Sequence, residues 1–122
     1  MMKRKILSVL LTTLIVVFGC GSGMAGQSET KTGDALIVRG QGSFLGIILV
    51  TDGANAVTLN IYDNYTASGK KLIPTDTVIT TSATDRIQAI GFSAKDVNYY
   101  KGIYVDITCV GTVSYMIYYD PR

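Results

Sequence analysis

Two sets of side chains alternate with a period of two along three stretches of the chain, residues 57–62, 103–109 and 113–119. Side chains two positions apart lie on the same face of a β-strand, so each stretch predicts a strand with one face against a core. Only a short link containing Gly111 separates the last two stretches. They are therefore predicted to form a closing hairpin.

Turn residues divide the rest of the chain into further short apolar stretches. Strands are predicted at residues 35–38, 44–51, 72–73, 75–81 and 87–93. The Asp52-Gly53 pair is a strong hairpin signal, and no stretch of useful length has the period of a helix. About eight short strands separated by turns are typical of a two-sheet protein without crossover helices. We predict an all-β fold, a single small antiparallel β-sandwich or jelly roll.

The amino terminus has the order of a bacterial export signal. Residues 6–18 are almost entirely apolar, they follow three consecutive basic residues, and small residues come soon after them. The apolar stretch is shorter than the roughly 20 residues of a membrane-spanning helix. We therefore predict that residues 1–25 are a signal peptide and that the protein is exported.

Two cleavage positions are open. Residues 17–20, Val-Phe-Gly-Cys, resemble the lipobox of bacterial lipoproteins, which implies cleavage before Cys20, lipidation of that cysteine and a membrane anchor. Phe18 departs from the lipobox, which usually has a smaller side chain there. Alternatively, Gly23 and Ala25 place small residues at −3 and −1, so that cleavage after Ala25 would give a secreted protein. The first alternative favours the cell envelope, in the outer membrane or periplasm.

Residues 21–33 are predicted to be a flexible tether, followed by a sandwich domain over residues 34–122. Gly, Ser, Thr and charged residues dominate this segment, and no apolar periodicity runs through it. Beyond residue 25 the chain has eight basic and nine acidic residues. This balance excludes the basic surplus of a nucleic-acid-binding protein.

The residue types argue against catalysis. The chain has no His, and its one Glu, Glu29, lies in the predicted tether. Most Asp residues fall at predicted turns, where Asp commonly caps its own backbone. Asp52 and Asp63 are turn residues of this kind, and neither segment has the ligand pattern of a calcium loop. We therefore predict no enzyme activity, no cofactor and no metal site, and an extracellular hydrolase is the least favoured alternative.

Tyrosine is the unusual residue of the domain, since all eight tyrosines of the chain follow residue 25. Tyr62, Tyr104 and Tyr118 fall at outward positions of the predicted strands, where they make a candidate binding face for a protein or a glycan. The alternative is that these rings only stabilise exposed sheet through cross-strand pairs. Cys109 is predicted to be a small hydrophobe on the inner face of a strand.

Turn and strand motifs resemble those of a known group of proteins. They are Gly42-x-Phe44-x-Gly46-Ile47, Asp52-Gly53, Val57-x-Leu59-x-Ile61-Tyr62-Asp63-Asn64, Ala67-Ser68-Gly69-x-x-Leu72 and Gly102-Ile103-Tyr104-Val105-Asp106. This pattern is similar to small β-sandwich structural proteins of tailed bacteriophages. The resemblance implies a role in virion architecture or decoration through self-association, without catalysis. Such proteins carry no export signal, whereas this chain begins with one.

Two functions are therefore expected. The first is an exported, non-catalytic module of the cell envelope that acts in binding or structural assembly, held to the membrane if Cys20 is lipidated. The alternative is a virion-type structural protein of prophage origin that forms homo-oligomers.

Overall fold

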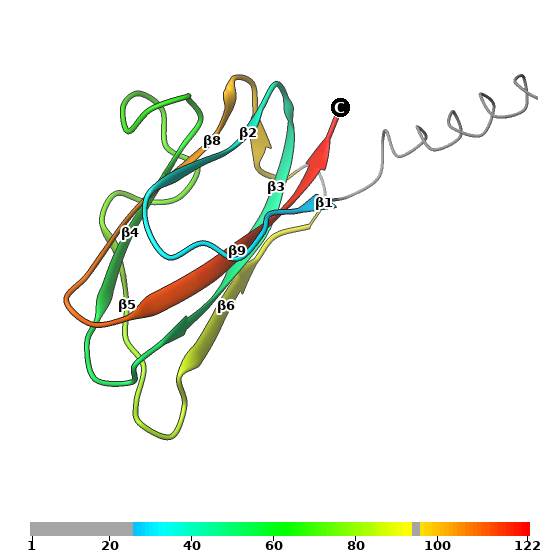
Figure 1. Ribbon diagram of the computed structural model, residues 1–122. Coiled ribbons are helices and arrows are strands. Elements are labelled where there is room, and N and C mark those ends of the chain that lie inside the picture. Colours follow the sequence, from blue (N-terminus) through cyan, green and yellow to red (C-terminus); the bar gives the residue numbers. More distant parts are fainter. Residues whose placement is uncertain (1–25, 94–95) are drawn as a thin grey trace, which may run out of the picture.

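Two antiparallel sheets form the protein in the computed structural model, which describes residues 26–93 and 96–122 (Figure 1). Sheet A has the order β1 (Gly26–Gln27), β9 (Val113–Pro121), β3 (Gly42–Thr51) and β6 (Ile87–Gly91), and the short β7 (Asn98–Tyr99) also pairs with β3. Sheet B has the order β2 (Ala35–Arg39), β8 (Gly102–Cys109), β4 (Val57–Tyr62) and β5 (Thr77–Ile79). The predicted signal peptide, including Cys20, lies outside the described residues.

The predicted fold class is confirmed. The chain crosses repeatedly from one sheet to the other. In each of the pairs β1 and β2, β3 and β4, β5 and β6, and β8 and β9, one strand lies in sheet A and the other in sheet B. These sheet orders are those of an eight-stranded jelly roll, to which β7 is a short addition. The described residues therefore contain nine strands, against about eight predicted. The link between β8 and β9 crosses from sheet B to sheet A, so those strands do not form the predicted hairpin.

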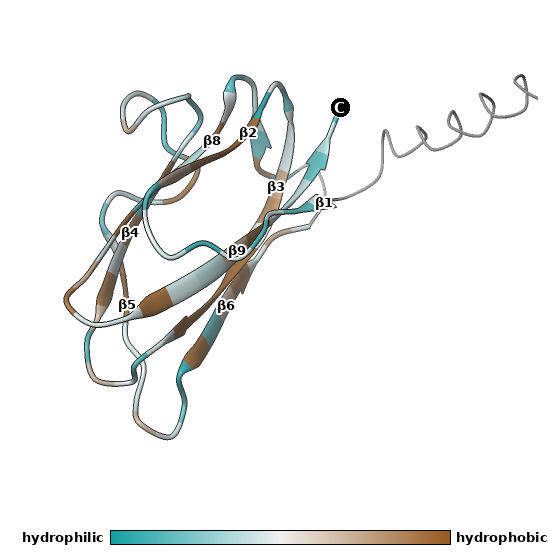
Figure 2. Cartoon of the chain, in the orientation of Figure 1, coloured by the Kyte–Doolittle hydropathy of each residue, from teal (hydrophilic) through white to brown (hydrophobic). Residues whose placement is uncertain are grey.

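The core lies between the two sheets and is built from the inward side chains of both. Figure 2 shows that the strands carry most of the strongly hydrophobic positions. Phe44, Leu59, Ile61, Ile103 and Ile117 are fully buried there. The ring of Phe44 also meets that of Phe92, with 5.7 Å between centroids. Burial of this apolar surface is the main force that holds the sheets together.

A β-bulge in β3 sets which of its residues face the core. Phe44 pairs with Tyr119 but Gly46 pairs with Tyr118, so one extra residue lies on the β3 side. Gly46 has a φ of 148°, in a region that favours glycine. Because the bulge changes the alternation, Phe44 and Ile47 both face the core although they are three positions apart.

Part of the segment predicted as a tether pairs with sheet A. Gly26 pairs with Tyr119, and Lys31 forms an isolated bridge with Tyr115. The Ser28 N–H donates to the Ile117 carbonyl at 2.8 Å. This segment is polar because it lies at the edge of sheet A, where backbone pairing with β9 holds it. Among the described residues, the segment from Gly26 to Lys31 therefore lies against sheet A.

Two tyrosines are buried between the sheets, and among the described residues only one of their hydroxyls has a hydrogen-bond partner. Tyr99 is fully buried, and its hydroxyl has no hydrogen-bond partner among the described residues. The Tyr115 hydroxyl instead donates to the Gly33 carbonyl at 2.6 Å. Burial, followed by the charge of Tyr119, raises the pKa of Tyr99 to about 12 from 10.0. Burial also raises the pKa of Tyr115.

Replacing Tyr99 with phenylalanine is expected to raise the free energy of unfolding by roughly 1 kcal/mol, because a buried hydroxyl without a partner is removed. The matched change Tyr115→Phe should lower it by a similar amount.

The raised pKa of Tyr99 also makes stability depend on pH. The hydroxyl of the unfolded chain ionises from about pH 10.0, whereas that of the folded protein ionises only towards pH 12, so the free energy of unfolding falls over that range. Urea unfolding of Y99F should therefore show a smaller loss of stability over that range. Equal losses for Y99F and the unchanged protein would contradict this account.

Candidate functional site

The three tyrosines predicted to share a binding face do not lie together. Tyr62 and Tyr104 are direct cross-strand partners on the outer face of sheet B. Tyr118 is half-buried on β9 of sheet A, where it pairs with Gly46. The alternation correctly gave an outward position to each ring, but it did not show which sheet each strand joins.

Tyr62 and Tyr104 belong to a larger group of aromatic and basic side chains at one end of the sandwich. We call this group the basic aromatic end, and it consists of Arg39, Tyr62, Tyr65, Lys70, Lys71, Tyr100, Lys101 and Tyr104. It is formed by the end of β2, β4, the loop after β4, the turn between β7 and β8, and β8, at the upper end of Figure 1. Four of the eight basic residues that follow residue 25 are in this group.

The buried carboxylate of Asp63 holds these segments together. Asp63 is 7% exposed, and its Oδ1 accepts the N–H groups of Tyr100 at 2.9 Å and Lys101 at 2.8 Å. A third, longer bond of 3.4 Å comes from the Gly102 N–H. The Gly40 N–H donates to the Lys101 carbonyl at 2.9 Å, which joins the turn after β2 to the turn between β7 and β8. The positions of Tyr100 and Lys101 therefore depend on a side chain far away in sequence.

Cations lie over tyrosine rings throughout the basic aromatic end. The Arg39 guanidinium carbon is 4.7 Å from the centroid of the Tyr65 ring. The Lys71 ammonium is 5.0 Å from the ring of Tyr62. The Lys70 ammonium is 5.6 Å from the ring of Tyr100. Such contacts order the long basic side chains and leave their charge uncompensated.

No carboxylate of the described residues forms an ion pair with these cations. The nearby carboxylate of Asp63 is buried and accepts backbone N–H groups. Tyr65 is 43% exposed and Tyr100 is 58% exposed, so both rings reach the surface beside the cations. The surface therefore offers positive charge, hydrogen-bond donors and aromatic area together, which suits an anionic ligand with some apolar surface.

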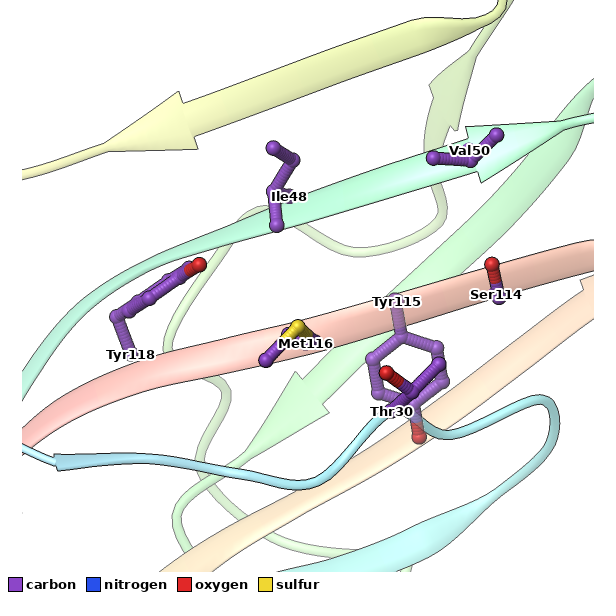
Figure 3. Close-up of a pocket in the computed structure, with 7 residues that line it drawn as sticks. All are labelled: Thr30, Ile48, Val50, Ser114, Tyr115, Met116 and Tyr118. Carbon is purple, nitrogen blue, oxygen red and sulfur yellow. The ribbon is translucent and has the colours of Figure 1, made fainter.

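A second surface feature is an apolar trough on the outer face of sheet A (Figure 3). It has a volume of about 240 Å³ and is lined by Thr30, Ile48, Val50, Ser114, Tyr115, Met116 and Tyr118. Ile48 pairs with Met116, and Val50 pairs with Ser114, so these outward side chains are cross-strand neighbours. The apolar run of β3 predicted a central strand, and β3 does lie between β9 and β6. No further layer of the described residues covers its outer side, and Val50 is 38% exposed.

The carboxylates considered for metal binding serve local structure. Asp52 Oδ1 accepts the N–H groups of Ala54 at 2.8 Å and Asn55 at 3.0 Å. These bonds lower the pKa of Asp52 to about 2, and the bond from Ala54 has the largest effect.

Asp106 lies on the outer face of sheet B, away from these turns. Burial, followed by the charge of Asp34, raises its pKa. Across the described ranges, no group of three or more His, Cys, Asp or Glu residues is placed to hold a metal ion.

Cys109 lies at the last position of β8, opposite Val57. It packs against the core but is only half-buried, because the strand ends there at the rim of the sandwich. Its orientation therefore follows the prediction, while its burial is less complete.

Only weak signals in the sequence point to the basic aromatic end. Its cations are at positions 39, 70, 71 and 101, so they form no charge run longer than two residues. Lys70 and Lys71 follow Gly69 in a predicted loop, where exposed lysines are ordinary. The Asp63 hydrogen bonds that gather these segments join residues nearly forty positions apart.

Comparison of the chain with protein-family models, curated proteins and solved structures gave no match. Within residues 26–93 and 96–122, there is also no helix long and apolar enough to cross a membrane.

Proposed function

We propose that this protein is an exported, non-catalytic β-sandwich module of the cell envelope that binds an acidic glycan through its basic aromatic end. The observation that carries the proposal is a group of cations that lie over or beside tyrosine rings at the surface and form no ion pair with a carboxylate of the described residues. Tyrosine rings offer apolar area to the C–H faces of a sugar. The lysine and arginine side chains offer charge-assisted hydrogen bonds to its carboxylate or phosphate groups.

The position of β1 supports an action close to the membrane. Gly26, the first residue of β1, pairs with Tyr119, which also pairs with Phe44 near the start of β3. β1 therefore starts towards the end of the sandwich that carries Arg39. If Cys20 is lipidated, the residues between it and Gly26 span at most about 20 Å. The proposed ligand is accordingly a glycan near the membrane surface.

Glycan binding can be tested with the processed protein and two polysaccharides, acidic polygalacturonate and neutral dextran. We expect affinity electrophoresis to show retention by polygalacturonate only, and added salt to weaken it because exposed charges are screened. The double variant Lys70→Gln/Lys71→Gln and the variant Tyr100→Ala should each bind about tenfold more weakly, a change of about 1.4 kcal/mol. The matched controls on the sheet A side are Tyr118→Ala, in β9, and Lys31→Gln, at the bridge beside β9, and both should bind like the unchanged protein.

Three results would contradict glycan binding at this end. One is equal retention by the two polysaccharides, and another is a loss in the sheet A controls as large as that in the basic variants. The third is that vesicles containing anionic phospholipid bind the unchanged protein through the same residues while polygalacturonate does not. That last result would assign the basic aromatic end to lipid headgroups.

The location of the protein and its proposed lipid anchor are tested separately by the intact mass of the mature chain from a membrane fraction. Lipidation predicts a diacylglycerol-modified amino terminus at Cys20, and Cys20→Ser should move the protein out of the membrane fraction. An unmodified start at Gly26 would remove the anchor and make the protein a secreted module. In that case the first mature residue would also be the first residue of β1.

A virion-type structural protein is the second candidate. The observation that favours it is the jelly-roll order of the strands, since jelly rolls are common in viral capsid proteins as well as in lectins. This argument rests on the fold alone, which many functions share. Isolation of the protein within a phage particle, together with loss of particles on its deletion, would establish this function in place of the first.

A further inference from the structure

The strand β6 forms one edge of sheet A and differs from the other sheet edges. Natural sheets protect their edges with short strands, bulges or charged residues. β1 has two residues, β5 has three, and β2 has a register shift between Leu36 and Val38. β6 has five residues in regular register with β3, and its sequence, Ile-Gln-Ala-Ile-Gly, contains neither charge nor proline.

Backbone groups of β6 point alternately towards β3 and away from the sheet. The Thr51 N–H donates to the Arg86 carbonyl at 3.0 Å, and the Phe92 N–H donates to the Leu45 carbonyl at 2.8 Å. Because hydrogen-bonded pairs alternate along an antiparallel ladder, Gln88 and Ile90 also bond to β3. The N–H and C=O groups of Ile87, Ala89 and Gly91 therefore face outward, where no strand of the described residues pairs with them.

We propose that β6 pairs antiparallel with β6 of a second copy of this chain, about a two-fold axis that passes beside Ala89. In this register Ala89 faces its own counterpart, and Ile87 faces Gly91 of the other copy. Each of these is a hydrogen-bonded pair, so every outward N–H and C=O of β6 finds a partner. The dimer would join the two copies of sheet A into one continuous sheet.

The side chains of β6 suit self-pairing for two reasons. Ile87 is 55% exposed, and in the proposed register it would cover the outer side of a glycine, which leaves room for it. The adjoining charged residues, Asp85 and Arg86, would lie at opposite ends of the paired strands, so that identical charges would not meet. A strand paired with its own copy satisfies the closed two-fold symmetry of most homodimers. The contact is small, so a weak dimer is expected.

Sedimentation equilibrium of the processed protein in mild detergent tests this inference. The unchanged protein should form dimers at micromolar concentration. Ala89→Lys should be monomeric because two lysines would face each other, and Ala89→Glu should be monomeric for the same reason. A mixture of the two variants should form a heterodimer, since the charges are then opposite. Val78→Lys, at a 59% exposed position on the edge strand β5, is the matched control and should dimerise normally.

Ala89→Pro gives a second test that involves only the backbone. Proline removes the outward N–H of Ala89 and none of the bonds to β3, so the monomer should remain folded while the dimer is lost. A monomeric unchanged protein at every concentration would overturn the proposal. So would dimers of Ala89→Lys as tight as those of the unchanged protein, or a mixture of the lysine and glutamate variants that stays monomeric.

Self-pairing and glycan binding can be separated experimentally, because Ala89 lies outside the basic aromatic end. Monomeric Ala89→Lys should bind short acidic oligosaccharides as the unchanged protein does. It should bind long polygalacturonate more weakly, since a dimer presents two binding ends to one chain. If short oligosaccharides are not bound at all, the proposed function fails while the dimer can still be established by sedimentation.

Discussion

Replacement of Gly46 with alanine is expected to lower the free energy of unfolding by more than about 3 kcal/mol. A Cβ at this position would lie 2.3 Å from the Ile90 carbonyl oxygen, which is a backbone atom of the neighbouring strand. The φ of 148° also disfavours a side chain. To make room, β3 and β6 would have to separate, or β3 would have to lose its bulge and turn Ile47 away from the core. Urea unfolding followed by circular dichroism measures the change.

Gly40→Ala is the matched control for this prediction. Gly40 has a φ of 103°, but a Cβ there would meet nothing within 4 Å. Only backbone strain is then added, which costs about 1–2 kcal/mol. Similar losses in the two variants would show that strain, and not the clash with β6, limits position 46.

Replacement of Asp63 with alanine is expected to cost about 3 kcal/mol, because it leaves the partly buried N–H groups of the turn between β7 and β8 without their acceptor. Asp63→Asn retains an acceptor oxygen but loses the charge, so it should cost less. The alanine variant should also weaken polygalacturonate binding, since Tyr100 and Lys101 lie in that turn. Denaturant unfolding and affinity electrophoresis measure the two effects.

The exposed turn residue Asp85 supplies the control for Asp63. Its side chain makes no hydrogen bond with another segment of the described residues, so Asp85→Ala should change stability by less than about 0.5 kcal/mol. A loss in Asp63→Ala no larger than that in Asp85→Ala would show that the carboxylate does not hold the turn. Reduced stability with unchanged glycan binding would place the binding surface away from Tyr100.

The sequence predicted the strands well where one face of a sheet meets the core and the other meets solvent. The alternation over residues 57–62 became β4, with Val57, Leu59 and Ile61 buried. The strand β3 could not be predicted so closely. Its continuous apolar run contains no alternation, and the bulge at Gly46 exchanges the inward and outward sets of residues.

The binding face predicted from the sequence shares two residues with the basic aromatic end, and its function stays a prediction. Tyr62 and Tyr104 were correctly given outward positions, and they face each other across β4 and β8. Tyr118 was grouped with them although it lies in the other sheet. The sequence predicts a tether over the segment that includes Gly26, because pairing with β9 through the backbone needs no apolar pattern in its own residues.

Local chemistry explains what the sequence determined by itself: short strands, turns at Asp and Gly, and the all-β class follow from side-chain alternation and backbone preferences between near neighbours. The tertiary structure decided which strands share a sheet and which surface residues gather at one end. Those choices depend on contacts between distant segments, such as the bonds from Asp63 to the turn before β8. Periodicity along one strand carries no information about its neighbours, so the basic aromatic end and the exposed edge of β6 emerge only in the folded chain.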